Sequence, residues 1–304
     1  MTVTKEKEGI IYGAVSYMLW GIVPIYWKQL EHIGSIEILM HRVLWSCVFM
    51  IVLLSVTKKL PALFAYIKDI SKNYKKLFAL IAAAVFVSVN WGIFIWAVNN
   101  GKILDTSLGY YINPLISVLL GVVVLKEKLA RAQVASFCLA LTGVIILTVY
   151  YGEFPWISFA LALTFAFYGL VKAMIGAEAS IGLTLETIIM LPVAIVYLFF
   201  SISKGDVELP ARPDLLLLMG GGVVTALPLL LFAIGANRIP LTLLGFLQYI
   251  APTLSMLVGV LLYHEVFTKV HAISYGFIWG ALLLFSFSQM KMRASVERKV
   301  SEGA

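Results

Sequence analysis

The chain has 304 residues, of which 61% are apolar and 13% charged, and its mean hydropathy is +0.96. A soluble domain is roughly 45–50% apolar and about 25% charged, so this composition excludes an ordinary cytosolic enzyme, a disordered tail and a nucleic-acid module. We therefore expect a membrane protein, and we interpret the net charge of +7 as orienting charge gathered in loops.

Long apolar runs follow one another along the whole chain. A helix needs roughly 20 apolar residues to cross a hydrocarbon core of about 30 Å. The predicted spans are residues 9–27, 38–56, 77–98, 103–125, 132–150, 155–172, 183–203, 214–236, 241–262 and 270–290. These runs are continuous and too long for barrel strands, so the predicted fold is an all-α integral membrane protein with ten transmembrane helices.

Lysine and arginine are distributed unevenly between the connections. With the N-terminus in the cytoplasm, 17 of them lie in inner segments and 5 in outer segments, while Arg42 lies inside a span. The positive-inside rule therefore predicts that both termini are cytoplasmic. The longest inner connection, 57–76, has apolar residues at helical spacing between lysines, and it is interpreted either as an interfacial amphipathic helix on anionic lipid or as a solvated linker.

Two segments of the chain repeat each other. A shift of 138 positions aligns 111–127 with 249–265 and gives eight identities in seventeen positions, among them Pro114 with Pro252. The shared segments are the fourth and ninth spans, which predicts two five-helix repeats, 1–152 and 153–304. Because five is odd, the second repeat is inverted in the membrane, and inverted repeats are typical of secondary transporters.

The two matched prolines are candidate helix breaks. A proline inside a span frees a backbone carbonyl at membrane depth, which is tolerated best beside a cavity. We interpret Pro114 and Pro252 as lining such a cavity, and a simple packing kink is the alternative.

Several stretches are similar to one known family. They are MLWGIVPIYWK (18–28), EILMHRVLWS (37–46), NWGIFIWAVNNGKILDTSLGYYINPL (90–115), GLTLETIIMLP (182–192) and QYIAPTLSMLVGVLLYHE (248–265). Together they resemble RarD-type permeases of the EamA family, within the drug/metabolite transporter superfamily, over essentially the whole chain. The resemblance implies two inverted five-helix repeats in a bacterial inner membrane and a link to chloramphenicol sensitivity, with the transported compound poorly defined.

Polar and aromatic residues inside the spans are the candidates for a substrate path. The expected substrate-binding residues are Trp20, His41, Arg42, Asn90, Trp91, Tyr110, Tyr111, Asn113, Gln248 and Tyr249. His41 and Arg42 lie about one turn inside the outer end of the second span. They are interpreted as an anion-sensing pair with His41 as a possible proton acceptor, and the alternative is that Arg42 snorkels to the outer headgroups. The amides and aromatics supply stacking faces and hydrogen bonds for a substrate, or else they join helices.

The remaining motifs have structural interpretations. We expect Tyr26 and Trp27 in the outer aromatic belt, Asp105 as an N-terminal cap, and Glu186 in the first turn of its helix beside the helix dipole. Glu127 and Glu265 are expected in interfacial ion pairs with flanking basic residues, and Gly220 to Gly222 in close helix packing. Four histidines and two scattered cysteines predict no metal site, and we expect no cofactor.

The sequence thus predicts a secondary transporter or exporter of small organic metabolites or drugs, not an enzyme, that works by alternating access on a proton or substrate gradient. The expected partners are a small-molecule substrate and membrane lipids, without nucleic acid, and a homodimer stays open. Two alternatives remain, an intramembrane enzyme acting on lipids or peptides and a membrane signalling or scaffold protein.

Overall fold

The computed structural model describes residues 3–125, 131–175, 177–204, 212–236, 238–239 and 247–302. Within these ranges every regular element is a helix. The elements are α1 (Val3–Lys28), α2 (Ser35–Val56), α3 (Leu60–Ile70), α4 (Tyr74–Asn99), α5 (Ile103–Leu125), α6 (Arg131–Tyr151), α7 (Trp156–Ile175), α8 (Ala179–Lys204), α9 (Arg212–Ala236), α11 (Ile250–Leu257), the π-helical turn η1 (Val258–Leu262) and α12 (Lys269–Glu302).

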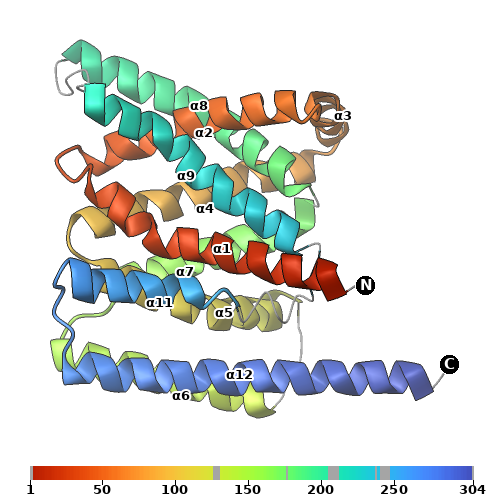
Figure 1. Ribbon diagram of the computed structural model, residues 1–304, viewed down its shortest axis with the longest axis vertical. Helices are drawn as coiled ribbons and strands as arrows, with labels where there is room; N and C mark the ends of the chain where they lie inside the picture. The colour runs from red at the N-terminus through yellow and green to blue at the C-terminus, as the bar shows by residue number, and fades with distance from the viewer. Residues whose placement is uncertain are drawn as a thin grey trace.

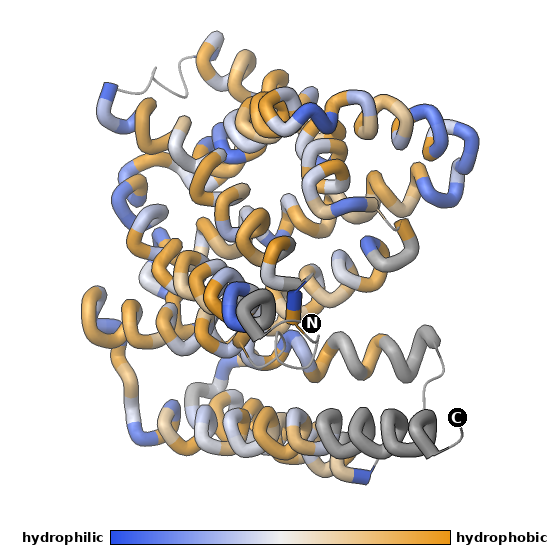
Figure 2. Tube along the Cα trace, turned by 45° about the vertical axis from the view of Figure 1, so that its right-hand side comes forward, coloured by the Kyte–Doolittle hydropathy of each residue, from blue (hydrophilic) through white to orange (hydrophobic). Residues whose placement is uncertain are grey.

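Helix length and composition support a membrane protein. Within the described ranges, six helical segments are long and apolar enough to cross a membrane: Lys7–Lys28, Ser35–Val56, Tyr74–Asn99, Ala179–Lys204, Arg212–Phe232 and Lys269–Ser288. Three shorter apolar helices accompany them, and apolar residues run along most of the length of the helices (Figure 2). The chain is therefore an all-α, multi-pass membrane protein, while the full number of ten spans remains a prediction.

The long helices lie roughly side by side (Figure 1). The start of α1 and the end of α12 lie at the same end of the bundle. The principal packing partners are distant in sequence: α1 lies against α9 and α11, α2 against α8 and α9, and α4 against α7 and α8. The helix α5 packs on α7 and α11, and α6 packs on α12. Almost every helix of the N-terminal half is thus in contact with the C-terminal half.

The helix α3 lies across the end of the bundle where α1 begins and is seen nearly end-on in Figure 1. Leu63 and Ile70 are buried on one face, while Phe64 is 65% exposed on another. Tyr66 donates a hydrogen bond from its hydroxyl to the carbonyl of Ile175, at 2.9 Å. This short crosswise helix with one packed and one free face fits the interfacial helix better than a solvated linker.

The glycine run at 220–222 lies where three helices meet. A β-carbon on Gly221 would come within 3.0 Å of the Trp27 ring, and one on Gly222 would clash with the backbone of Trp45. Glycine therefore allows α1 and α2 to approach α9 closely, which confirms the packing role expected for this run.

Candidate functional site

Arg42 lies in the interior of the bundle. It is the eighth residue of α2, about two turns from the start of that helix, because α2 begins at Ser35 rather than at residue 38. The residue is 8% exposed, and its Nε donates a hydrogen bond to Oγ1 of Thr225 on α9 at 3.0 Å. A guanidinium held in this way does not reach the headgroups, so the snorkelling alternative is wrong for this structure.

Two indole rings contact the guanidinium of Arg42. Its Cζ lies 4.1 Å from the ring centre of Trp91 on α4 and 5.1 Å from that of Trp27 on α1. Cation–π contacts of this kind are each worth about 0.5–2 kcal/mol, more when water is excluded. We call this group, Trp27, Arg42, Trp91 and Thr225, the Arg42 cage.

The cage corrects the expected position of Trp27. This side chain is 1% exposed and touches Arg42, so it does not belong to an outer aromatic belt. Its neighbour Tyr26 stacks edge-on against it, at 5.1 Å between ring centres, and its hydroxyl hydrogen-bonds to the carbonyl of Leu217 on α9. Both aromatic residues therefore join α1 to α9.

Asn90 and Tyr110 extend the cage toward α5 and α7. The Tyr110 hydroxyl donates to Oδ1 of Asn90 at 3.3 Å. The Asn90 amide in turn donates to the carbonyl of Leu161 at 3.0 Å and to Oγ1 of Thr164 at 2.9 Å. Asn90 is 1% exposed, so these bonds satisfy a polar group that has no access to water.

A second group of predicted residues lies between α5, α11 and α12. The hydroxyl of Tyr111 is 2.6 Å from Oγ1 of Thr253, and the rings of Tyr111 and Tyr249 stack at 6.4 Å. Tyr249 also interacts with the side chains of Gln248 and Ser286. The structure thus brings Tyr111, Gln248 and Tyr249 together, but away from the hydrogen bonds of the Arg42 cage.

The two prolines occupy different local settings. Pro114 lies in the interior of α5, whereas Pro252 lies in the first turn of α11, directly after a turn at 248–249. A proline in a first helical turn removes no intrahelical hydrogen bond. The residues matched in sequence are therefore not equivalent in backbone geometry within the described part of the chain.

The other predicted site residues are dispersed. Trp20 packs against Tyr17 and Phe232, at 5.4 and 5.9 Å between ring centres. Asn113 is half-buried on α5. His41 is 8% exposed, and its Nδ1 has no hydrogen-bond partner among the described residues.

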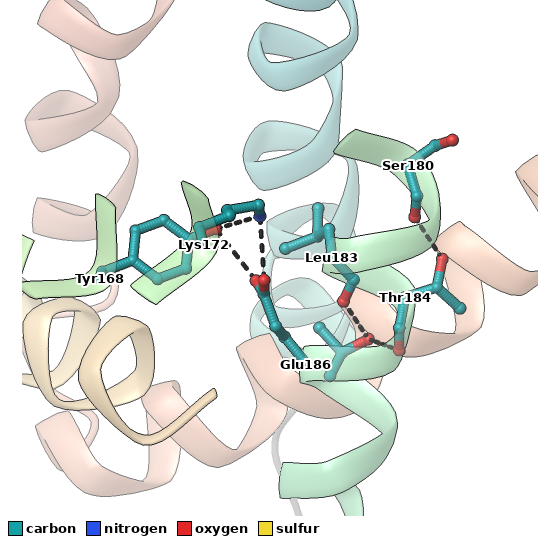
Figure 3. A network of polar contacts seen from close by, with 7 residues as sticks. Tyr168, Lys172, Ser180, Leu183, Thr184 and Glu186 are labelled. Atoms are coloured by element: carbon teal, nitrogen blue, oxygen red, sulfur yellow. Dashed lines mark hydrogen bonds and ion pairs between the residues drawn. The ribbon is translucent and has the colours of Figure 1, made fainter. Parts of the chain in front are cut away.

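A buried ion pair, which sequence reasoning did not foresee, joins α7 to α8 (Figure 3). Nζ of Lys172 lies 2.9 Å from one carboxylate oxygen of Glu186, and the Tyr168 hydroxyl donates to the other at 3.0 Å. Lys172 also hydrogen-bonds to the Tyr168 hydroxyl. Because α8 begins at Ala179, Glu186 lies two turns into its helix, and the expected first-turn position is wrong.

The N-terminus of α5 is capped from the other half of the chain. The two carboxylate oxygens of Glu265 accept hydrogen bonds from the backbone amides of Ile103 and Leu104, at 2.7 and 2.8 Å. Within the described ranges Glu265 forms no ion pair, so the ion pair expected for it is wrong. The carboxylate that binds these amides belongs to Glu265 and not to Asp105, the residue expected as the cap. Its sequence counterpart Glu127, with Lys126 and Lys128, lies outside the described residues.

A cavity of about 450 Å³ opens beside this cap. Its wall carries the charged or titratable side chains of Lys102, Asp105, Glu153, His264, Glu265 and His271. None of the predicted substrate-binding residues lines it. The cavity therefore does not coincide with the Arg42 cage.

Outside the spans, one ion pair ties α3 to the connection between α7 and α8. Lys59 hydrogen-bonds to the carboxylate of Glu178, which also accepts a bond from Ser180. The hydrogen bond and charge of Lys59 lower the pKa of Glu178 below its ordinary value. Both side chains are about half exposed, so the pair is weak.

Four residues of the site were not expected from the sequence. Thr225, Thr164 and Thr253 are hydroxyl partners from the C-terminal half, and Trp27 belongs to the cage. A polar residue inside an apolar run was a usable signal for the threonines. Trp27 gave no such signal because it lies next to Lys28, at the end of its helix.

Comparison with known proteins gives consistent matches. Residues 7–149 match the model of the EamA-like transporter family. The chain is 46% identical to the "Uncharacterized transporter YojE" of Bacillus subtilis, with 95% of this chain and 97% of the relative covered. It is 40% identical to "Protein RarD" of Escherichia coli, covering 94% and 96%, and 30% identical to "Chloramphenicol-sensitive protein RarD" of Pseudomonas aeruginosa, covering 96% and 98%. A solved crystal structure shares the fold with a TM-score of 0.59 at 17% identity, covering 94% of this chain and 99% of that one.

Proposed function

This chain belongs to the EamA-like transporter family as a RarD-type permease, and on that basis we propose that it is a secondary transporter that exports small organic metabolites or drugs by alternating access. Transport requires two arrangements of the helices that open the same site to opposite sides of the membrane. Two inverted repeats supply such a pair of arrangements, because exchanging their conformations exchanges the open side.

The observation that carries the proposal is the matched packing of the two halves. If α1, α2, α4, α5 and α6 correspond in order to α7, α8, α9, α11 and α12, most of the principal contacts have counterparts. Contact of α1 with α9 corresponds to α7 with α4, contact of α2 with α9 to α8 with α4, and contact of α1 with α11 to α7 with α5. In three further contacts the two helices are each other's counterparts, as expected for helices beside a two-fold axis: α2–α8, α5–α11 and α6–α12.

The helices beside this proposed axis also hold many of the candidate substrate groups. Arg42 lies on α2, Tyr110 and Tyr111 on α5, and Tyr249 directly before α11. In transporters built from inverted repeats, substrate sites lie near the interface between the repeats. This placement supports a substrate path between the halves, through the Arg42 cage and the tyrosines of α5.

The proposed topology has both termini in the cytoplasm. It is supported by the excess of Lys and Arg in the predicted inner connections and by the common end of the bundle at which α1 begins and α12 ends (Figure 1). We expect the driving energy to come from a proton gradient or from exchange with a second substrate.

The test is release of metabolites from reconstituted vesicles. Liposomes containing the full-length protein are loaded with a bacterial metabolite extract, and the compounds released with and without a pH gradient or counter-substrate are identified by mass spectrometry. We expect selective, gradient-dependent release that is absent from protein-free liposomes. Release that depends only on added ATP, or conversion of a labelled lipid without release, contradicts the proposal and favours another class of protein.

A further inference from the structure

Arg42 is a buried cation without a partner acid in the described part of the chain. A guanidinium stays charged at all physiological pH values, so it does not escape burial by losing its proton. Among the described residues no carboxylate lies within ion-pairing distance of Arg42, and the residue is 8% exposed. A charge in this setting is unfavourable unless something else in the site compensates it.

Two other partly buried cations differ from Arg42 because each lies beside an acid. Lys172 on α7 has Glu186 of α8 at 2.9 Å, and Arg238, in the turn at 238–239, has Glu8 of α1 at 3.7 Å. Each acid comes from a different element than its cation, so these pairs also join elements of the fold. Arg42 has no such acid beside it within the described ranges. It therefore differs from cations whose only role is to join two elements through an ion pair.

The cage leaves a defined part of the guanidinium free. Nε is used by Thr225, and the indole rings of Trp27 and Trp91 contact the group. The bond through Nε is the single hydrogen bond of this side chain to the described residues, which leaves the two terminal amino groups. Two parallel N–H donors of one guanidinium match the two oxygens of a carboxylate.

Resting on the transport function proposed above, we propose that the Arg42 cage is an anion-binding subsite and that the transported compounds carry a carboxylate on an apolar, preferably aromatic, body. One carboxylate neutralises one guanidinium, whereas a phosphate dianion would leave an uncompensated negative charge among apolar groups. Trp91, Phe94 and Tyr110 provide aromatic surface at the cage. The ring centres of Phe94 and Tyr110 are 5.9 Å apart. The cage thus selects the charge of the substrate, and its surroundings select an apolar body.

Binding to the purified protein tests this class directly. Benzoate is compared with its neutral analogue benzamide, with benzylamine and with phenyl phosphate, by calorimetry on the full-length protein in detergent. We expect benzoate to bind at least ten-fold more tightly than benzamide, and phenyl phosphate and benzylamine to bind more weakly than benzoate. Equal affinity for benzoate and benzamide, or a preference for phenyl phosphate, overturns the proposal.

Variants connect the preference to the cage. Arg42→Gln is expected to remove the preference for benzoate over benzamide, and Arg42→Lys to retain part of it, because a lysine keeps the charge but not the two parallel donors. Arg131→Gln, which removes an exposed arginine at the start of α6, is the matched control and should leave the preference unchanged. If the glutamine variant does not accumulate, Arg42→Lys is the deciding variant. Full retention of the wild-type preference for benzoate over benzamide by Arg42→Lys contradicts a bidentate site.

The vesicle experiment separates failure of this inference from failure of the proposed function. If extract-loaded liposomes release neutral or cationic compounds but no carboxylates, the protein is a transporter and the inferred substrate class is wrong. If they release nothing under any gradient while purified protein prefers benzoate, the anion subsite stands and transport is wrong. Replacing Arg42 by Ala should abolish carboxylate release while membrane abundance stays intact, and unaltered release removes Arg42 from the site.

Discussion

The ion pair between Lys172 and Glu186 is buried unequally. The Glu186 side chain is 1% exposed, whereas the Lys172 side chain is 24% exposed. Removing one member of a buried pair leaves the other charge uncompensated, and the penalty depends on whether that charge can find water. The two members should therefore differ in how much their loss destabilises the protein.

Lys172→Met should lower the free energy of unfolding by about 3–5 kcal/mol, because it leaves the carboxylate of Glu186 charged in the interior. Glu186→Gln should cost less, since the lysine left behind can turn toward solvent. The double variant should lose less than the sum of the single variants. The measurement is the thermal unfolding midpoint of each purified protein in the same detergent.

Lys204→Met is the matched control for this comparison, because Lys204 is exposed at the end of α8. It should leave the midpoint within the error of the measurement. A Glu186→Gln protein as unstable as Lys172→Met would show that burial of the carboxylate does not decide the energetics of the pair.

At the scale of single elements, α5 depends on a carboxylate contributed by a residue some 160 positions later. The first amides of a helix have no intrahelical partner, and an acid at this position satisfies them and interacts favourably with the helix dipole. Glu265 does both for Ile103 and Leu104. The beginning of α5 is therefore held in place by the segment that follows η1.

Glu265→Ala should lower the free energy of unfolding by about 0.5–2 kcal/mol, the usual range for loss of an N-terminal cap. Hydrogen exchange at the amides of Ile103 and Leu104 should become faster, and Glu265→Gln should have an intermediate effect because its amide still offers one acceptor oxygen. Glu153→Ala, an exposed carboxylate of the same cavity wall, is the control. Unchanged exchange at both amides in Glu265→Ala would rule out the capping role.

The ion pair between Lys59 and Glu178, which ties α3 to the connection before α8, is expected to respond to pH. Lys59 lowers the pKa of Glu178 in the folded protein, so the pair contributes stability above the ordinary glutamate pKa of about 4.3 and loses it as pH falls through the lowered value. Since both side chains are half exposed, the contribution should stay below about 1 kcal/mol. The midpoints of wild type and Glu178→Gln should thus differ slightly at pH 7 and converge at pH 3.

Comparing wild type with Glu178→Gln in high salt provides the control for this ion pair, because salt screens exposed ion pairs. The difference between wild type and Glu178→Gln should shrink in 1 M NaCl at pH 7. A difference that persists at pH 3 would assign the effect of the substitution to something other than the ion pair.

At the scale of the whole molecule, alternating access requires the two halves to move against each other. A β-carbon placed on Gly259 would lie 3.2 Å from the β-carbon of Ile103, a few tenths of an ångström less than the roughly 3.5–4.5 Å found in disulfides, so a small outward shift would allow a bridge. In a protein with Cys47 and Cys138 replaced by alanine, the pair Ile103→Cys and Gly259→Cys should form a disulfide on oxidation. Release from proteoliposomes should then stop and return after reduction.

The single-cysteine variants, oxidised in parallel, are the controls for this experiment, and they should retain release. A crosslinked protein that releases metabolites at the rate of its reduced form would show that the two halves do not separate at this end of the bundle. Transport would then need a movement elsewhere between the halves.

The sequence was sufficient for the helical membrane class and for the family, because both depend on long apolar runs and on contiguous motifs. It also located Arg42 as an unusual residue, since a charge inside an apolar run is visible without a structure. The close packing at Gly220 to Gly222 followed from residue size alone. These features are local, and local patterns are what a single sequence displays.

The partners of the polar residues could not be predicted in the same way. Glu186 and Glu265 looked like ordinary helix-end acids, and their actual contacts come from Lys172 and from the α5 amides. Trp27 looked like a belt residue because its position in α1 is terminal, but Arg42 of α2 and the helix α9 cover it. Such contacts depend on tertiary packing between segments far apart in the chain, which local patterns do not encode.

The cap on α5 also bears on how the protein is made. During synthesis, Ile103 and Leu104 leave the ribosome long before Glu265, so the start of α5 lacks its final hydrogen-bond partners until most of the chain has been translated. A fragment of residues 1–152 would never obtain them from its own sequence. Completion of an early helix by a late residue thus makes the second half of the chain part of the folding of the first, and the first half should be less stable when expressed alone than when produced together with the second.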